Sequence, residues 1–579
     1  MDFQTLHHQA LEQLNTYKKK ANLCAFLRFF TMIFCIGGLL YGYYQQRPVF
    51  YYIAGCCLVV FMILVTIHQK VKTRCMYYQN LASVYQSHRD RQMNEWSSFQ
   101  DTGVEFIQEH EMLSHDLDLF GDHSLFQMMN ICKSNKGRRQ FARSLTEGLA
   151  FERIKIRQQA IQELKDHPDF ITRFEVFTYN ISHQCDGQFP HENCQSIPKA
   201  CLLMGPLFIL FSLFLMLFHN VYGRILFEVV FVLQLSMSFI MSGRHQAMFE
   251  PLLKSEKSLN AYQEGFECLH DMKFESEALK SLHHSLFVEH QALEGMKGLS
   301  QLATLVRQRF NIFAMVLLNG LFGYDFIVRE CYRRWFEDYG CCVDQWLEDF
   351  AEIEVLISLA IPAIDGFAVS VPSVICQPNL ELSFHHLRHP LIPQDKVVGN
   401  DFHLEHQTNV ITGSNMSGKT TFMRTVALNL VLAQAGGYVF ADDMTCSYMH
   451  ILTSMRVRDN VEEGISTFYG ELLRIKDMIT YSQTQQPMIC FIDEIFKGTN
   501  SLDRIAGAKA TLEKLSLPYC MVFITTHDFE LTKMDHVLYS NYHFEEHYVD
   551  GQLCFDYQIK KGPSTSTNGK FLLQQVGIL

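Results

Sequence analysis

The pattern of apolar and polar residues divides the chain into a long helical part with extended apolar stretches and a C-terminal part of short alternating strands and helices. Two apolar stretches are long enough to cross, or nearly cross, the hydrocarbon core of a membrane. Val49–Ile67 holds 19 residues without a charge, and Cys201–Phe218 holds 18 residues with Ser212 as its main polar interruption. We predict that each is a membrane-spanning helix; a buried helix of a soluble protein is the alternative.

Each of these stretches has a weaker apolar neighbour a few residues away. Cys24–Tyr44 carries Arg28, and Ile225–Met241 carries Glu228 and Gln234. Because the links are short, each weak stretch should pair with its strong neighbour as a helical hairpin. The pattern thus predicts four transmembrane helices in two hairpins, with lipid as their surroundings.

Basic residues flank the hairpins unevenly. An even number of spans leaves both termini and the middle of the chain on one side, and the two short opposite loops hold only Arg47 and Arg224. The basic residues on the first side are Lys18, Lys19, Lys20, Lys70, Lys72, Arg74, Lys199 and Arg244. Because positive residues stay on the cytoplasmic side, we expect a multi-pass protein of the cell membrane with its large parts in the cytoplasm.

From Val371 onward, β-rich runs alternate with helical runs, which is typical of an α/β domain with a mostly parallel sheet. The whole pattern predicts six segments: an N-terminal amphipathic helix (1–23), a transmembrane hairpin (24–68), a helical segment (69–199), a second transmembrane hairpin (200–242), a returning helical segment (243–370) and the α/β domain (371–579).

Composition agrees with a partly membrane-embedded chain. Of 579 residues, 48% are hydrophobic and only 19% are charged, which is unusual for a purely soluble protein. The 49 basic and 61 acidic residues give a net charge of −12, which argues against extensive contact with nucleic acid, although a local basic face could still bind phosphate. The 18 cysteines contain no CxxC pair, so we interpret them as reduced thiols and not as a zinc site.

Candidate chemistry begins at a phosphate-binding loop. Residues 413–420 have the form GxxxxGK[ST], after the apolar run Asn409–Thr412 and before a stretch of helical character. In such a loop, glycines let the backbone wrap a triphosphate, Lys419 reaches the outer phosphates of ATP and the Thr420 hydroxyl holds Mg²⁺. A chance match in a loop is the alternative. The candidate nucleotide-binding residues are Gly413, Ser414, Asn415, Met416, Ser417, Gly418, Lys419, Thr420 and Thr421.

Two further strands end in residues that suit ATP hydrolysis. The apolar strand that starts at Met488 ends in Asp493, which can hold the Mg²⁺ shell, and Glu494, which can polarise an attacking water. A third strand, Tyr519–Thr526, is followed by His527, which can sense the γ-phosphate by hydrogen bonding. A core strand with a solvated acidic end, and a structural histidine, are the alternatives.

These motifs resemble those of the MutS family of DNA mismatch-repair ATPases. In chain order, the family's RHP, TGPNMGGKS, STF, DEIGRGTS, ATHYFEL and closing segments are similar to Leu387–Pro390, Thr412–Thr420, Ser466–Phe468, Asp493–Asn500, Thr526–Leu531 and Lys561–Gly569. The resemblance covers about residues 385–579, and a weaker likeness to the family's helical core starts near Leu117–Gly121.

The resemblance implies a P-loop, ABC-like ATPase that uses ATP and Mg²⁺ and works as a homodimer. In such a dimer each domain completes the other's site, so Ser466 would act on the partner's γ-phosphate. Asp493 would keep the magnesium role, Glu494 the water-activating role and His527 the sensor role. The helical segments on either side of the second hairpin would form the family's core.

The sequence also departs from the family. No segment matches the family's mismatch-reading domain, and Phe496 and Lys497 replace a Gly-Arg pair near the dimer face. We predict a membrane-anchored MutS-like ATPase coupled to DNA, either mismatched or branched. Local support for DNA comes from a basic run, for which a solvated helix face is the alternative: Lys133, Lys136, Arg138, Arg139 and Arg143.

Two other functions remain open from the sequence. A membrane ATPase could act on a protein or lipid partner without DNA, which fits the hairpins and the unmatched mismatch-reading domain. An ABC-type transporter is the third reading, but the family signature LSGGQ is absent and two separate hairpins make a poor translocation pathway.

Overall fold

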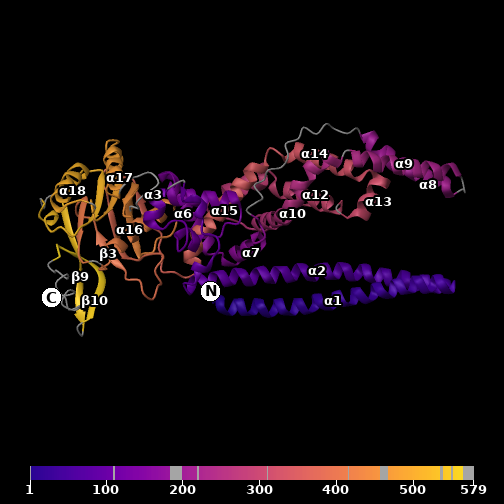
Figure 1. Cartoon of the computed structure of the whole chain (residues 1–579), viewed down its shortest axis with the longest axis horizontal. Helices are drawn as coiled ribbons and strands as arrows, with labels where there is room; N and C mark the ends of the chain where they lie inside the picture. The colour runs from indigo at the N-terminus through magenta and orange to yellow at the C-terminus, as the bar shows by residue number, and fades with distance from the viewer. Residues whose placement is uncertain are drawn as a thin grey trace.

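The computed structural model of the chain is elongated, with an α/β domain at one end and helices along the rest of its length (Figure 1). It describes residues 2–108, 111–182, 199–217, 221–240, 242–309, 311–414, 416–456, 467–497, 499–534, 539–549 and 552–564. The order of elements confirms a helical N-terminal region followed by a domain that contains sheets.

The first apolar hairpin consists of two long continuous helices, α1 (Phe3–Gln45) and α2 (Pro48–Gln92). They lie side by side, and the thiol of Cys35 is 3.4 Å from the carbonyl oxygen of Ala54 in their interface. The structure differs from the expected separate helix over 1–23, because α1 continues through it. The N-terminal half of α1 contains no proline or glycine that would interrupt its hydrogen bonds.

The second hairpin is formed by α8 (Lys199–Leu217) and α9 (Val221–Ile240), and both hairpins extend toward the end of the molecule opposite the α/β domain (Figure 1). By length and composition, three of the described helices could cross a membrane, namely α1, α2 and α9. The apolar part of α8, Leu203–Leu217, is shorter. Helices α13 (Ile312–Phe322) and α14 (Tyr324–Tyr339) are long enough only together, and they bend by 83°.

The other helices of this region form a core between the hairpins and the α/β domain. They are α3 (Glu111–Leu117), α4 (Leu125–Met129), α5 (Asn135–Thr146), α6 (Phe151–Lys165), α7 (Pro168–Thr178), α10 (Ser242–His270), α11 (Glu277–His284), α12 (Ala292–Gln308) and α15 (Val343–Ile364). The ring of Phe350 on α15 lies 5.2 Å from that of Phe174 on α7 and 5.1 Å from that of Phe266 on α10. The core is therefore assembled from segments on both sides of the second hairpin.

Two sheets form the C-terminal domain, with strand orders β10–β9–β4–β8–β7–β6 and β1–β5–β2–β3. The strands are β1 (Ser373–Ile375), β2 (Leu382–Leu387), β3 (Asn400–His403), β4 (Thr408–Thr412), β5 (Asp443–Ser447), β6 (His450–Ser454), β7 (Met488–Asp493), β8 (Cys520–Thr525), β9 (Tyr539–Val549) and β10 (Gln552–Lys561). In the larger sheet, neighbours from β9 to β6 are parallel and β10 is antiparallel to β9. The smaller sheet has both kinds of pair, so the domain as a whole is mixed α/β.

Alternating side chains of the larger sheet enter two different apolar cores. On β7, Phe491 belongs to the core that includes α16 (Lys419–Gln434), and its neighbour Ile492 belongs to the core that includes α17 (Thr467–Ser482) and α18 (Ser501–Leu515). Helices on both faces hold the central strands in place, and the carboxyl ends of β4, β7 and β8 meet at one edge of the sheet.

Candidate nucleotide-binding site

The candidate site lies where the parallel strands β4, β8 and β7 end together. Strand β8 is the central member of the three, and Asp493 at the end of β7 lies directly opposite Thr525 at the end of β8. Strand β4 ends at Thr412, where the glycine-rich loop begins. Three segments that are about 30 to 80 residues apart in sequence are thereby brought to one edge, because parallel strands place their carboxyl ends on the same side.

The loop between β4 and α16 depends on backbone conformations that favour glycine. Gly413 has φ 147° and Gly418 has φ 107°, and a Cβ atom at Gly413 would lie 2.9 Å from the carbonyl oxygen of Phe544. Met416 also has a positive φ, of 69°, and Asn415 lies outside the described residues. The loop ends where α16 begins, so the free N–H groups of that helix end face the loop and can receive an anion.

Lys419 points back into the loop and is almost fully buried. Its Nζ donates hydrogen bonds to the carbonyl oxygens of Gly413 at 2.9 Å and Ser414 at 2.7 Å, and only 5% of the residue is exposed. Burial lowers the pKa of this ammonium, although the nearby carboxylates of Glu494 and Asp493 act in the opposite direction. A buried cation held only by carbonyl oxygens is well placed to meet a phosphate.

Asp493 is held between two hydroxyl groups. Thr420 donates to one of its carboxylate oxygens at 2.9 Å, and Thr525 donates to the other at 2.5 Å. One hydroxyl and one carboxylate form the oxygen donor set that Mg²⁺ uses when phosphates and water supply its other ligands. Among the residues that the structure describes, no cluster of three or more His, Cys, Asp or Glu side chains could hold a metal, so a metal here would depend on bound phosphate.

Glu494 and His527 contact each other at the ends of neighbouring strands. The Nε2 atom of His527 lies 3.1 Å from Glu494 Oε1, and Lys497 Nζ lies 3.1 Å from Glu494 Oε2. The hydrogen bond from His527, together with the charge of Lys497, lowers the pKa of Glu494 to about 2. Glu494 has φ 52°, and its N–H donates to Thr525 Oγ1 at 3.0 Å. The carboxylate is thus ionised and fixed beside the strand end.

The structure brings together five of the residues that the sequence selects as functional, namely Lys419, Thr420, Asp493, Glu494 and His527. Ser466 lies outside the described residues. Lys497 stands where the family has an arginine, and the sequence gives no reason for this difference. In the structure, Lys497 contacts Glu494.

Sequence reasoning missed a pocket of about 170 Å³ beside the loop. It is lined by His389, Ile392, Lys396, Val397, Val398, Asn400, Gly418, Thr421, Phe422, Thr425 and Tyr557. Tyr557 comes from β10 with φ 54°, and a Cβ atom at Gly418 would lie 3.2 Å from its ring. Of these residues, the sequence motifs mark Gly418, Thr421 and His389 but not the pocket itself, because it is assembled from three separate parts of the domain.

Helix α16, which follows the loop, contacts the helical core through an acidic segment near residue 117. In the sequence this segment shows only a weak likeness to the family's core. Arg424 on α16 pairs with Asp118 and donates to the carbonyl oxygen of Asp116 at 2.9 Å. The buried Asp116 carboxylate accepts from the backbone N–H groups of Met455 at 3.0 Å and Arg456 at 2.9 Å. The core therefore contacts both the loop helix and the end of β6.

A glycine-rich loop at a helix N-terminus with a buried lysine is an arrangement that can receive an anion. The family model for MutS domain V matches residues 409–577. The DNA mismatch repair protein MutS of Staphylococcus epidermidis is 35% identical over 229 residues, which are 38% of this chain and 25% of that protein. The MutS protein of Thermus thermophilus is 32% identical over 193 residues, which are 33% of this chain and 24% of that protein. The MutS protein of Lactobacillus johnsonii is 31% identical over 246 residues, which are 40% of this chain and 28% of that protein.

The C-terminal part of the chain is therefore similar to the corresponding part of MutS proteins, as its motifs predict. The chain spans about a quarter of the length of these relatives. The similarity reaches at most 40% of this chain in these three relatives, so the apolar helices have to be interpreted from their own chemistry.

Proposed function

We propose that this protein is a membrane-anchored, MutS-like ATPase that binds and hydrolyses ATP at a site completed by a second copy. The observation that carries the proposal is the convergence of Lys419, Thr420, Asp493, Glu494 and His527 at the carboxyl edge of one parallel sheet. Each residue type matches a step of phosphoryl transfer: a cation for the phosphates, an oxygen pair for Mg²⁺, a base for the water and a hydrogen-bond donor for the γ-phosphate.

In the proposed mechanism, Lys419 exchanges its loop carbonyls for phosphate oxygens. Thr420 and Asp493 would hold Mg²⁺, which would neutralise phosphate charge when bound. Glu494 orients the attacking water and accepts its proton. His527, which contacts Glu494, would donate a hydrogen bond to the γ-phosphate. The pocket beside Gly418 is lined by both apolar and polar side chains, including Val397, Phe422 and Asn400, and we propose that it receives the nucleotide base.

The homodimer comes to this proposal from the family resemblance. Ser466 would reach the γ-phosphate bound by the partner subunit, and the partner's copy would do the same in return. At the edge of the site, the charged side chain of Lys497 is about half exposed. A site that needs two copies predicts that ATPase activity depends on protein concentration.

Membrane anchoring is supported by length and polarity in the first hairpin. Between Lys20 and the tip, Arg28 is the one charged residue of α1, and the apolar stretch is about 20 residues or ~30 Å long, which matches a bilayer core. At the base, the rings of Tyr17 and Tyr78 stack at 5.2 Å beside the lysine cluster, and at the tip Tyr44 is 83% exposed. Tyrosines at both ends of an apolar stretch are typical of membrane interfaces.

DNA is the proposed partner because the relatives are named DNA mismatch repair proteins. The basic run around Lys136 and Arg138 supports DNA binding less than its sequence indicates. Arg138 pairs with Asp101 at 2.6 Å, and Lys136 pairs with Asp344 at 3.2 Å, so these two cations are already compensated inside the protein. Arg139 is exposed and remains a candidate for phosphate contact. This pairing favours the second candidate function, an ATPase that acts on a protein or lipid partner without DNA.

Steady-state ATPase activity of the full chain in lipid nanodiscs tests the proposal. Lys419→Ala should abolish turnover, whereas Lys155→Ala, an exposed lysine on α6, should not change it. Homoduplex, mismatched and branched DNA are added at physiological salt, because phosphate contacts weaken steeply as salt rises. Stimulation by DNA supports the DNA-coupled function. Turnover that no DNA changes supports the second candidate, and activity that survives Lys419→Ala would refute the site.

A further inference from the structure

Helix α13 exposes an apolar surface that the sequence pattern did not mark as a membrane segment. It contains no charged residue, and its exposed side chains include Ile312 at 73%, Phe313 at 88%, Leu317 at 56% and Phe322 at 45% exposure. A run of large apolar side chains open to solvent on so short a helix indicates a surface that something apolar covers.

The apolar surface of α13 is continuous with that of the second hairpin. A Cβ atom at Gly320 would lie 2.3 Å from the ring of Phe231 on α9, so the two helices approach closely at this glycine. Exposed apolar side chains of α9 continue on the same unit, including Val232 at 59% and Met237 at 56% exposure. Figure 1 places α13 and α9 next to each other, at the end of the molecule to which both hairpins extend.

The residues that flank α13 contact each other through their side chains. Arg309, just before α13, donates from Nε to Asp325 Oδ2 at 2.9 Å, and both side chains are nearly buried. Ser238 on α9 donates to the same carboxylate oxygen at 2.8 Å. These polar contacts therefore join the two flanks of the segment that contains α13. They lie near the end of α9, where that helix leaves its apolar stretch.

Some of the polar backbone groups at the ends of α13 are paired inside the protein, which lowers their cost in lipid surroundings. The Asn311 side chain accepts from the N–H groups of Phe313 and Ala314, and the Gly323 N–H donates to the carbonyl oxygen of Asn319 at 3.0 Å. An 11-residue helix is about 16 Å long, which is half of a bilayer core. Helix α14 does not continue the insertion, because it turns by 83° and carries several charged residues.

We propose that α13 is a re-entrant helix that inserts into the acyl chains beside α9 and returns to the side from which it came. The inference rests on the proposed membrane anchoring and extends it: the second membrane element has three lipid-contacting helices, α8, α9 and α13, instead of a simple hairpin. Lipid acyl chains are the occupant because the exposed face of α13 continues that of the helices proposed to span the bilayer.

Tryptophan quenching tests the proposal in nanodiscs that contain lipids brominated on their acyl chains. The three native tryptophans are at most 5% exposed and supply a constant background. Phe313→Trp reports on α13, and Leu317→Trp is a second reporter if the first variant does not fold. Phe34→Trp on α1, at a residue 66% exposed, is the membrane control, and Tyr179→Trp, at a residue 38% exposed at the end of α7, is the aqueous control.

We expect bromolipid to quench the added fluorescence of Phe313→Trp and Phe34→Trp by at least twofold, and dissolved acrylamide to quench only that of Tyr179→Trp. Bromolipid quenching in Phe34→Trp but not in Phe313→Trp would overturn the re-entrant helix and leave membrane anchoring intact. If bromolipid quenches neither variant, both proposals fail. Protection of the α13 reporter from both quenchers would also overturn the inference, because another protein surface, such as a second copy, would then cover α13.

Discussion

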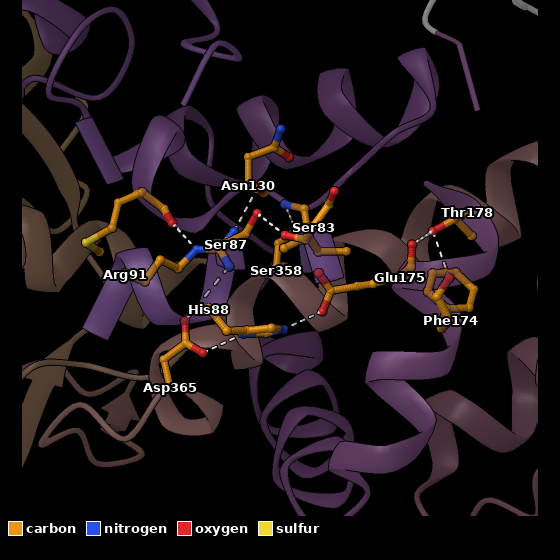
Figure 2. Close-up of polar contacts among 12 residues, drawn as sticks. Ser83, Ser87, His88, Arg91, Asn130, Phe174, Glu175, Thr178, Ser358 and Asp365 are labelled. Atoms are coloured by element: carbon orange, nitrogen blue, oxygen red, sulfur yellow. Dashed lines mark hydrogen bonds and ion pairs between the residues drawn. The ribbon is translucent and has the colours of Figure 1, made fainter. Parts of the chain in front are cut away.

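His88 on α2 and Asp365, the residue that follows α15, meet in a fully buried contact of 2.6 Å between Nδ1 and Oδ1 (Figure 2). The other ring nitrogen of His88 lies 3.0 Å from Glu175 on α7. Gln92, one turn further along α2, donates to the carbonyl oxygen of Asp365 at 2.9 Å. The first hairpin is therefore fixed to the point where the chain leaves the helical core for the α/β domain.

Replacing His88 should destabilise this junction in a pH-dependent way. Burial alone would lower its pKa, but Asp365 and Glu175 outweigh burial and raise it from 6.5 to about 9. The stabilisation is therefore complete below pH 6.5 and is lost as pH rises through about 9. His88→Gln removes the cation that bridges two buried carboxylates and leaves only Arg91, 3.9 Å from Asp365, so at pH 6.5 we expect a loss of about 3 kcal/mol.

Thermal unfolding in nanodiscs at pH 6.5, 8 and 9.5 measures this effect. The difference in Tm between the original protein and His88→Gln should be largest at pH 6.5 and should shrink toward pH 9.5. His8→Gln is the matched control, because the side chain of His8 is 76% exposed and its contact with Glu12 is 3.7 Å. A difference that does not change with pH would show that His88 is neutral in the folded protein.

Glu494→Gln should keep ATP binding and lower kcat by roughly a hundredfold or more, because a neutral amide cannot accept a proton from water. Since the pKa of Glu494 is about 2, its carboxylate stays ionised at every pH above about 4, and its titration should add no acid limb to the activity profile between pH 5 and 8. Single-turnover hydrolysis together with binding of a fluorescent nucleotide separates the two effects. Glu513→Gln on α18, at an exposed position, is the control.

Lys497→Met tests whether the ion pair with Glu494 restrains turnover. The pair is 3.1 Å long and Lys497 is about half exposed, so its loss should change the barrier by about 0.5 to 1 kcal/mol. We expect kcat to rise by a factor of about two to five with KM unchanged, because Glu494 would then be free to turn toward the water. A lower kcat would instead indicate that Lys497 itself contacts the γ-phosphate.

Five of the selected residues converge in the structure because they sit in local motifs. The loop before Lys419 and the strand before Asp493 each specify their own backbone, and parallel strands then bring the motif ends together without further information. The apolar segments that the sequence selects do not include every apolar surface that the structure exposes. The sequence pattern does not select α13, because an 11-residue apolar run is shorter than a membrane span, and the exposure of α13 depends on how it packs against α9.

Long-range polar contacts could not be read from the sequence. His88 and Asp365 are 277 residues apart, and neither belongs to a motif or to a periodic pattern. The same holds for Asp116 and Arg474, whose ion pair joins residues 358 positions apart. Such pairs arise from how whole helices pack, and a buried charge in a sequence does not reveal which distant residue compensates it.

Asp116→Asn should loosen the contact between the helical core and the α/β domain. The Asp116 side chain is fully buried and accepts from two backbone N–H groups and from Arg474 at 2.9 Å, so a neutral amide would leave the arginine uncompensated at a cost of about 3 kcal/mol. Asp118→Asn is the matched control, because Asp118 is 31% exposed and asparagine tolerates its φ of 51°. We expect a clearly larger loss of Tm for Asp116→Asn. In a double-mutant cycle, Arg474→Met should recover part of that loss, since it removes the buried charge; strictly additive losses would contradict the pairing.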